Sequence, residues 1–230
     1  MNVPTETPRS IAGIPAEWWL RLAHDLRGPV APMRMAVQLL RAGRIEAAER
    51  EEALAVIDRQ VEQLLAGIDD IGDLLRLQAG LPLHQPAQQD GNLLLDLVCG
   101  RGGLVRGLAA RRLRLRCEPC ESELPVHHDP VRVSALLEFL LLRAAAHAAP
   151  DSELVLALRP VPGGAELLLS GAGATLAQDA ELAALFGDAS VGDEPGLRAL
   201  LMREVLRGNA IALDHAGDGT LVLRFNERAG

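Results

Sequence analysis

The chain has 230 residues, of which 49% are hydrophobic and 23% charged, and its 31 acidic side chains against 23 basic ones give a net charge of −8. This composition excludes wholesale disorder, and the negative charge argues against nucleic acid or an anionic membrane as a partner, because both bind cationic surfaces. The sequence contains no lysine, which excludes the lysine-dependent phosphate loops and Schiff-base chemistry.

Three cysteines, an odd number, favour a reducing compartment over a disulfide framework. The amino-terminal residues lack the basic start and apolar run of a signal peptide, and the most apolar stretch, 135–149, is too short and polar to span a bilayer. We therefore expect a cytoplasmic protein.

The amino-terminal third of the chain has helical periodicity. Residues 1–14 show none and are predicted to be a flexible lead, whereas from Pro15 to about Leu40 apolar residues recur at alternating steps of three and four. A second apolar stripe keeps the same spacing and consists of Leu54, Ile57, Val61, Leu64, Ile68, Ile71 and Leu75. The turn at 41–44 predicts an antiparallel helical hairpin over 15–80. Because one hairpin cannot bury both stripes, two copies are expected to form a four-helix bundle.

The remainder, 81–230, alternates between helical and strand-like patterns. A polar linker at 84–90 precedes a predicted helix over about 93–110. Strand-like runs are predicted at 113–117, 154–159, 165–169, 210–214 and 220–225, and helices at 131–148, 176–185 and 197–206. The predicted fold class is therefore α+β, with the helical hairpin followed by an α/β sandwich that has one sheet and helices on one face.

The hexapeptide His24-Asp25-Leu26-Arg27-Gly28-Pro29 carries the chemistry. With Trp19 and Leu26 at heptad position a, His24 falls at position f and faces water, where a neutral imidazole can act as a nucleophile. Asp25 could orient the ring or take up its proton. Pro29 leaves the carbonyl four residues earlier without its donor, which predicts a kink near the histidine. The alternative is a surface histidine in a His-Asp pair that happens to precede a proline.

This hexapeptide resembles the phosphoacceptor box of sensor histidine kinases. The end of the second helix, 68–80, is similar to the exit of that family's dimerisation domain, and the order of helix, strand, 124–130 and helix is similar to the entry of its ATP-binding domain. The resemblance covers about residues 15–225. It implies a dimerisation and histidine-phosphotransfer domain at 15–80 and a kinase-like ATPase domain at 81–230.

The second domain departs from the family at its nucleotide site. Two asparagines that serve magnesium and phosphate in the family are matched by Phe139 and Arg143, neither of which supplies an oxygen ligand for magnesium. Ser170 stands in the place of the aspartate that holds adenine, and Gly196-Leu197 alone matches the final glycine box. The resemblance therefore implies a degenerate ATP site beside an intact phosphoacceptor box.

That combination is similar to the dimeric histidine phosphotransferases, which pass phosphoryl groups between the aspartates of response-regulator receiver domains. It implies His24 as the phosphorylated residue, Asp25 as its partner, and no cofactor of this chain's own, because the receiver supplies magnesium. Arg27 could steady phosphate charge or be an ordinary exposed helix arginine. The residues that could receive the partner are Leu26, Gly28, Pro29, Val30 and Met33, although Leu26 and Met33 also suit the bundle core.

Rival interpretations remain open. The chain could be an active cytoplasmic histidine kinase with a non-standard ATP site, or a non-enzymatic pseudokinase that binds response regulators. Cys117 and Cys120 with His127 and His128 have the residue types of a zinc site, but their spacing is irregular. We expect no metal bound by this chain.

Overall fold

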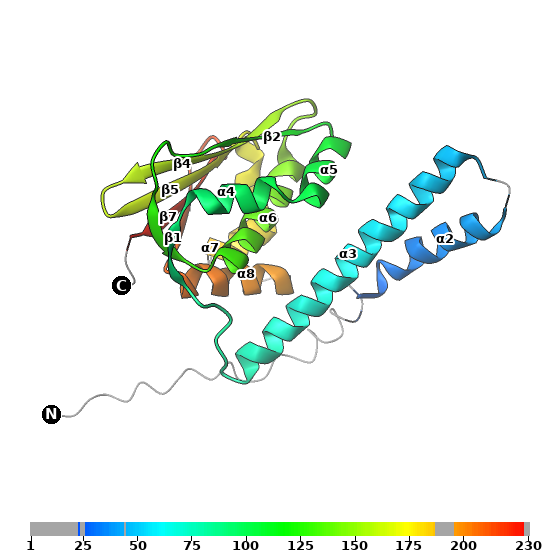
Figure 1. Ribbon diagram of the computed structural model, residues 1–230, viewed down its shortest axis with the longest axis horizontal. Coiled ribbons are helices and arrows are strands. Elements are labelled where there is room, and N and C mark those ends of the chain that lie inside the picture. The colour runs from blue at the N-terminus through cyan, green and yellow to red at the C-terminus, as the bar shows by residue number, and fades with distance from the viewer. Residues whose placement is uncertain (1–22, 24–25, 44, 187–195, 228–230) are drawn as a thin grey trace. The chain divides into compact units, whose positions relative to one another are not determined.

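The computed structural model describes residues 23, 26–43, 45–186 and 196–227. The chain divides into two compact units, Met1–Pro82 and Leu83–Gly230 (Figure 1). The first unit contains the helical hairpin and the second contains a sheet with helices. The predicted α+β fold class is confirmed.

The hairpin consists of α2 (Val30–Arg41) and the 32-residue α3 (Ala47–Gln78). Gly43 ends the first helix with a φ of +69°, a conformation that costs glycine little. Glu46 starts the second, because its side chain and that of Glu49 exchange hydrogen bonds with each other's backbone in a capping box. Local capping chemistry thus determines where the two helices are joined.

The first helix is interrupted where the sequence analysis predicted a kink. Leu26 and Arg27 are helical, but Gly28 and Pro29 form a turn, and Pro29 is the N-cap of α2. Proline has no N–H to continue the helical hydrogen-bond ladder, which accounts for the break. The interruption lies where the kink was predicted, and Pro29 itself keeps helical φ and ψ angles of −63° and −26°.

The hairpin leaves much of its predicted apolar stripe exposed. Ala36 and Ala53 are buried. Four of the seven α3 stripe residues are more than a third exposed: Leu54 at 43%, Val61 at 38%, Ile68 at 54% and Leu75 at 49%. Small side chains therefore bring α2 and α3 together, while large apolar side chains remain in contact with solvent.

The second unit is an α/β sandwich. Its helices are α4 (Asn92–Cys99), α5 (Gly102–Ala110), α6 (Pro130–His147), the 3₁₀ turn η1 (Ala174–Gln178), α7 (Ala180–Phe186) and α8 (Leu197–Gly208). Five strands form a sheet in the order β2-β4-β5-β7-β6, with bounds Arg114–Glu118, Glu153–Val161, Gly164–Ser170, Leu221–Asn226 and Ala212–His215. Only the β2–β4 pair within it is parallel. Helices cover one face of this sheet (Figure 1).

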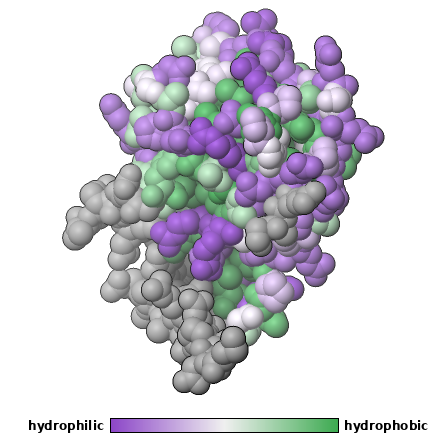
Figure 2. All heavy atoms as spheres, turned by 90° about the vertical axis from the view of Figure 1, so that its left-hand side faces the viewer, coloured by the Kyte–Doolittle hydropathy of each residue, from purple (hydrophilic) through white to green (hydrophobic). Residues whose placement is uncertain are grey.

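The core lies between that face and the helices. Along β5, Ala165, Leu167 and Leu169 are fully buried, while the residues between them are half-buried. This period of two is what a strand with one covered face requires. Figure 2 views the unit with the β4–β5 turn toward the reader, where hydrophilic side chains predominate over smaller apolar areas.

Several predicted boundaries differ from the structure. The segment 84–90, expected to be a linker, includes β1 (Ala87–Asp90), which pairs with β3 (Pro125–His128) in a separate two-stranded sheet. The helix expected over 93–110 is two helices, because Arg101 adopts an extended conformation between two glycines. The helix expected over 176–185 is likewise split into η1 and α7 by Asp179.

The structure also differs from the expectation that the three cysteines form no disulfide framework. Cys99 at the end of α4 and Cys117 in β2 form a disulfide, and Cys120 is free and half-buried. An odd count of cysteines had argued against such a link, but it does not prevent two of the three from meeting. The link ties α4 to the edge of the sheet. It also engages one of the four residues considered for zinc.

Candidate functional site

His24, the predicted phosphorylated residue, and Asp25, its predicted partner, lie outside the described residues. What the structure describes is the segment that follows them. Arg27 and Gly28 are exposed, and Pro29 is buried at the start of α2. The exposed Arg27 side chain is consistent with both interpretations given for it, a contact to phosphate and an ordinary surface arginine.

The predicted partner-binding residues divide between the hairpin core and the surface. Leu26 is half-buried, and its Cδ2 lies 2.9 Å from where a Cβ on Gly67 would be, so it packs closely against α3. Val30 is 42% exposed, and Met33 is half-buried. Val30 and Met33 line a groove between α2 and α3. Gly28 and Val30 are thus more accessible to a partner protein than Leu26, because they are more exposed to solvent.

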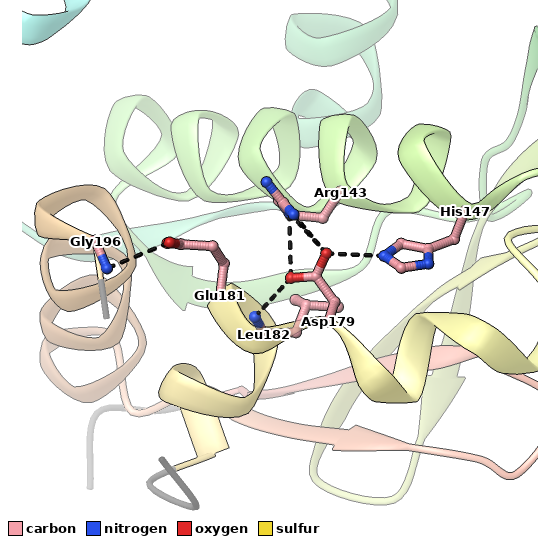
Figure 3. Close-up of polar contacts among 6 residues, drawn as sticks. All are labelled: Arg143, His147, Asp179, Glu181, Leu182 and Gly196. Atoms are coloured by element: carbon pink, nitrogen blue, oxygen red, sulfur yellow. Dashed lines mark hydrogen bonds and ion pairs between the residues drawn. The ribbon is translucent and has the colours of Figure 1, made fainter. Parts of the chain in front are cut away.

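In the second unit, α6 presents the two residues that match the family's asparagines. Phe139 is 7% exposed and belongs to the core. Arg143 lies one turn further and is ion-paired with Asp179, with Nη2 at 2.6 Å and Nε at 3.0 Å from Oδ2 (Figure 3). His147, one more turn along α6, places Nε2 2.9 Å from the same oxygen. Arg143 and His147 therefore share one carboxylate.

Asp179 is almost fully enclosed, with a side chain 1% exposed. Its Oδ1 also accepts a hydrogen bond from the backbone N–H of Leu182 at 3.1 Å, which caps the start of α7. Burial by itself raises the pKa of Asp179, but the hydrogen bonds from Arg143, His147 and Leu182 outweigh it and hold the pKa below its ordinary value. The carboxylate is therefore charged at neutral pH.

Ser170, predicted to stand in the place of the adenine-binding aspartate, is the last residue of β5. Leu169 is fully buried on the helix-covered face of the sheet, and Ser170 alternates to the other face. Gly171 and Gly173 follow with φ of +96° and +84°. At the end of β5, Leu169 thus faces the helices and Ser170 faces away from them. The apolar side chain of Leu169 cannot hydrogen-bond to a ligand on the helix-covered side of the sheet.

Gly196, the remaining predicted nucleotide-site residue, lies at the start of α8. Its backbone N–H donates to Oε1 of Glu181 at 3.3 Å (Figure 3). A Cβ on Gly196 would lie 2.9 Å from both carboxylate oxygens, so Glu181 sits directly against the first turn of α8. The negative charge suits this place, because helix amino termini carry a partial positive charge.

Of the four residues predicted for the degenerate nucleotide site, Arg143 and Gly196 each contact an acidic residue at the start of α7. Arg143 contacts Asp179, Gly196 contacts Glu181, and these two acids are two residues apart. Phe139 belongs to the core and Ser170 to the far face of the sheet.

Asp179, His147 and Glu181 were not predicted from the sequence, although it contains a signal for the first two of them. His147 follows Arg143 by four residues on one helix, which puts both side chains on one face. Asp179 precedes an apolar run in the position of an N-cap.

In residues 23, 26–43, 45–186 and 196–227, no group of three or more histidine, cysteine, aspartate and glutamate side chains is arranged to hold a metal ion. No helix in that part of the chain is long and apolar enough to cross a membrane.

The helical hairpin is similar to a known protein family. Residues 17–80 match the His Kinase A (phospho-acceptor) domain, and the matched range contains His24. The chain has a histidine kinase-like core. It is 30% identical over 155 residues to the alginate biosynthesis sensor protein KinB of Pseudomonas aeruginosa, a match that spans 66% of this chain and 25% of KinB. The chain is thus related to the histidine kinases of two-component signalling, although it spans only a quarter of that relative.

Solved structures with the same fold cover nearly the whole chain. The Acinetobacter baumannii histidine kinase AdeS superposes with a TM-score of 0.58 at 15% identity, over 90% of this chain and 98% of that one. Histidine kinase ThkA, in complex with the response regulator protein TrrA, superposes with a TM-score of 0.57 at 12% identity, over 93% of this chain and 62% of that one. At these identities the likeness concerns the fold.

Proposed function

We propose that this histidine kinase-like core is a histidine phosphotransferase, which passes a phosphoryl group between receiver-domain aspartates through His24. The observation that carries the proposal is the buried ion pair of Arg143 and Asp179. A guanidinium has no lone pair to offer a magnesium ion, and this one is already held by a carboxylate. This pairing supports the proposal, because the residue matched to a magnesium-binding asparagine of the family offers no oxygen ligand.

The proposed reaction needs few groups from this chain. A ring nitrogen of His24 attacks the phosphorus of a receiver's aspartyl phosphate, the P–O bond to the aspartate breaks, and the aspartate leaves as a carboxylate. Transfer to a second receiver reverses these steps. Asp25 orients the imidazole or takes its proton, and the exposed Arg27 steadies phosphate charge. Magnesium comes from the receiver, so catalysis here is largely positioning.

The surface around the phosphoacceptor box supports a response regulator as the partner. Val30 is 42% exposed and Gly28 is exposed beside the turn at Pro29. A fold relative, ThkA, forms a complex with the response regulator protein TrrA. Glycine at position 28 has no side chain to position a water molecule, so we expect transfer between proteins rather than hydrolysis of the phosphohistidine.

We also propose that the chain acts as a homodimer through the hairpin. Ile68 is 54% exposed in the single chain, and burial of the remaining half of an isoleucine side chain contributes about 1–1.5 kcal/mol, twice over in a symmetric dimer. Ile68→Gln is therefore expected to shift the protein from dimer to monomer in light scattering coupled to size-exclusion chromatography. Leu142→Gln, at an apolar residue of α6 that is 45% exposed, is the control. A monomeric wild-type chain at micromolar concentration would refute the dimer.

An active sensor kinase is the second candidate. The match of residues 17–80 to the phospho-acceptor domain and the likeness to AdeS favour it equally at the level of the family. A non-enzymatic pseudokinase that regulates response regulators by binding them is the third. The three candidates differ in where the phosphoryl group comes from, or in whether it reaches this chain at all.

One assay with two phosphate sources separates them. The purified chain is incubated with γ-labelled ATP and, separately, with a labelled phosphorylated receiver, each with wild-type protein and with His24→Gln. Label from the receiver alone, lost in His24→Gln, is the expected result. Label from ATP that depends on His24 would establish the kinase and refute the proposal. A stable receiver complex without any transfer would favour the pseudokinase.

A further inference from the structure

All three cysteines of the chain lie beside α4, and two of them are joined. Cys99, the last residue of α4, forms a disulfide with Cys117 in the edge strand β2. Cys120 is free, and its backbone N–H donates to Oδ1 of Asn92, the first residue of α4, at 2.9 Å. The segment from Cys117 to Cys120 therefore runs along α4 from its end to its start.

Apolar packing, and not only the disulfide, holds α4 and α5 in place. The residues of these two helices that face the core are apolar and buried: Leu94, Leu95, Val98, Leu104 and Leu108. The α/β unit, residues 83–230, is large enough to fold around such a core without the cross-links that small secreted domains usually need. We therefore expect the fold to survive reduction of the disulfide.

Contacts that do not involve sulfur hold both ends of the disulfide. Two residues beyond Cys99, Arg101 is ion-paired with Glu138 of α6. Cys117 belongs to β2, which is paired with β4 along its whole length. After reduction these contacts keep the two sulfur atoms near each other, which favours re-formation of the same disulfide.

The disulfide is accessible to small reagents, because Cys99 and Cys117 are both half-buried and neither lies within the core. Access of a thiolate to one of the two sulfur atoms is a requirement for thiol–disulfide exchange. The structure assigns Cys99 and Cys117 as a reversible thiol–disulfide modification site whose co-reactants are low-molecular-weight thiols and disulfides. This assignment goes beyond the proposed phosphotransfer through His24 and does not depend on it.

The exchange reaction balances with glutathione as the co-reactant. A glutathione thiolate attacks one sulfur of the disulfide, the sulfur–sulfur bond breaks, and the other cysteine leaves as a thiolate. A second glutathione attacks the mixed disulfide and leaves as glutathione disulfide, so that two electrons and two protons pass to the two cysteines. Glutathione disulfide oxidises the two thiols by the reverse steps.

Reduction is expected to loosen the corner between α4 and α5. In the oxidised chain this corner, Gly100 and Arg101, is held by the disulfide to β2 and by the ion pair to α6, and reduction removes the first of these. Backbone amide hydrogens of α5 are therefore expected to exchange faster in the reduced chain. Helix α8, which packs on α6, α7 and β6, is the internal reference and is expected to keep its exchange rate.

Stability gives a second measure of the same step. The disulfide joins positions 18 residues apart, and loss of a cross-link of this length is expected to lower the Tm of the α/β unit by about 6–12 °C. The full-length chain is equilibrated in reduced glutathione and, separately, in glutathione disulfide. Maleimide labelling in denaturant followed by mass spectrometry then counts the thiols, and we expect one in the oxidised chain and three in the reduced chain.

Serine variants assign the effect to individual cysteines. Cys99→Ser and Cys117→Ser are each expected to abolish the Tm difference between the two buffers. Cys120→Ser, the matched control three positions from Cys117, is expected to keep the full difference, because Cys120 is outside the disulfide.

Three thiols in both buffers would overturn the assignment, because the disulfide would not form, and one thiol in both would overturn its reversibility. Loss of the Tm difference in Cys120→Ser would also contradict it. If Cys99→Ser or Cys117→Ser does not fold, the wild-type chain decides, because proteolysis of the oxidised chain should yield a linked pair of peptides that contain Cys99 and Cys117. Absence of that pair refutes the assignment, whichever phosphate source labels His24.

Discussion

The ion pair of Arg143 with Asp179 makes a quantitative prediction for the variant Asp179→Asn. This substitution keeps the shape of the side chain and removes the charge that Arg143 faces. Loss of one partner from a fully buried ion pair costs about 3–5 kcal/mol. Asp179 is 1% exposed, but Arg143 is 35% exposed and keeps part of its hydration, so we expect a smaller cost of about 2–3 kcal/mol at neutral pH.

The structure offers a close control for this substitution. Asp151 also binds one arginine, Arg112, through both carboxylate oxygens, but these side chains are 63% and 71% exposed. Exposed pairs contribute about 0–1 kcal/mol. Asp151 also has a φ of +65°, a conformation that asparagine tolerates, so Asp151→Asn is expected to be close to neutral.

Calorimetry of thermal unfolding measures the difference between the two variants. At about 2–4 °C per kcal/mol for a chain of this size, Asp179→Asn is expected to lower the Tm of the α/β unit by about 4–12 °C. Asp151→Asn is expected to change it by less than about 4 °C. Equal effects of the two variants would refute the argument that burial makes the Asp179 pair important.

The same pair should make stability depend on pH in the acid range. Contacts with Arg143 and His147 hold the pKa of Asp179 below its ordinary value of 3.8. A carboxyl group whose pKa is lower in the folded state stabilises the fold fully above its unfolded pKa and loses that contribution as pH falls through its folded pKa. The stability gap between wild type and Asp179→Asn should therefore persist at pH 5 to 7 and shrink below about pH 4. A gap that widens on acidification would contradict this assignment.

Glycine-to-alanine substitutions test whether the space around each glycine and its φ angle determine the effect on stability. Gly72 in α3 has open space where a Cβ would stand, so Gly72→Ala should stabilise the hairpin by about 0.5–1 kcal/mol in urea unfolding, whereas Gly67→Ala, whose Cβ would meet Leu26 at 2.9 Å, should gain less. An equal gain at both positions would show that Leu26 yields without cost. Gly171→Ala should destabilise the α/β unit by more than about 1 kcal/mol, because its φ is +96° and its Cβ would collide with the carbonyl of Glu153. An unchanged Tm for Gly171→Ala would mean that the turn can rearrange.

The elements with strong periodicity could be predicted from the sequence alone. The strands β4, β5 and β7 and the helices α6 and α8 have an apolar pattern because each buries one face. The helix α3 was predictable from its apolar stripe, although the structure leaves much of that stripe exposed. The strands β1 and β3 were missed, since Ala87 pairs with His128 forty-one positions away and β1 itself is polar. Pairing between strands so far apart in the sequence produces no local hydrophobic pattern from which β1 could be predicted.

For the site, the sequence by itself determined the phosphoacceptor box, whose domain match covers residues 17–80. It also predicted that Phe139 and Arg143 replace magnesium ligands, because both inferences depend only on residue type and spacing. Only the tertiary structure decided what Arg143 does, since its partner Asp179 lies 36 positions away and is brought close by the packing of η1 on α6. A charged side chain in a sequence can be solvated or paired, and burial distinguishes the two. Residue type and spacing thus predicted where the chain departs from the family, and the fold showed that Arg143 is paired with Asp179.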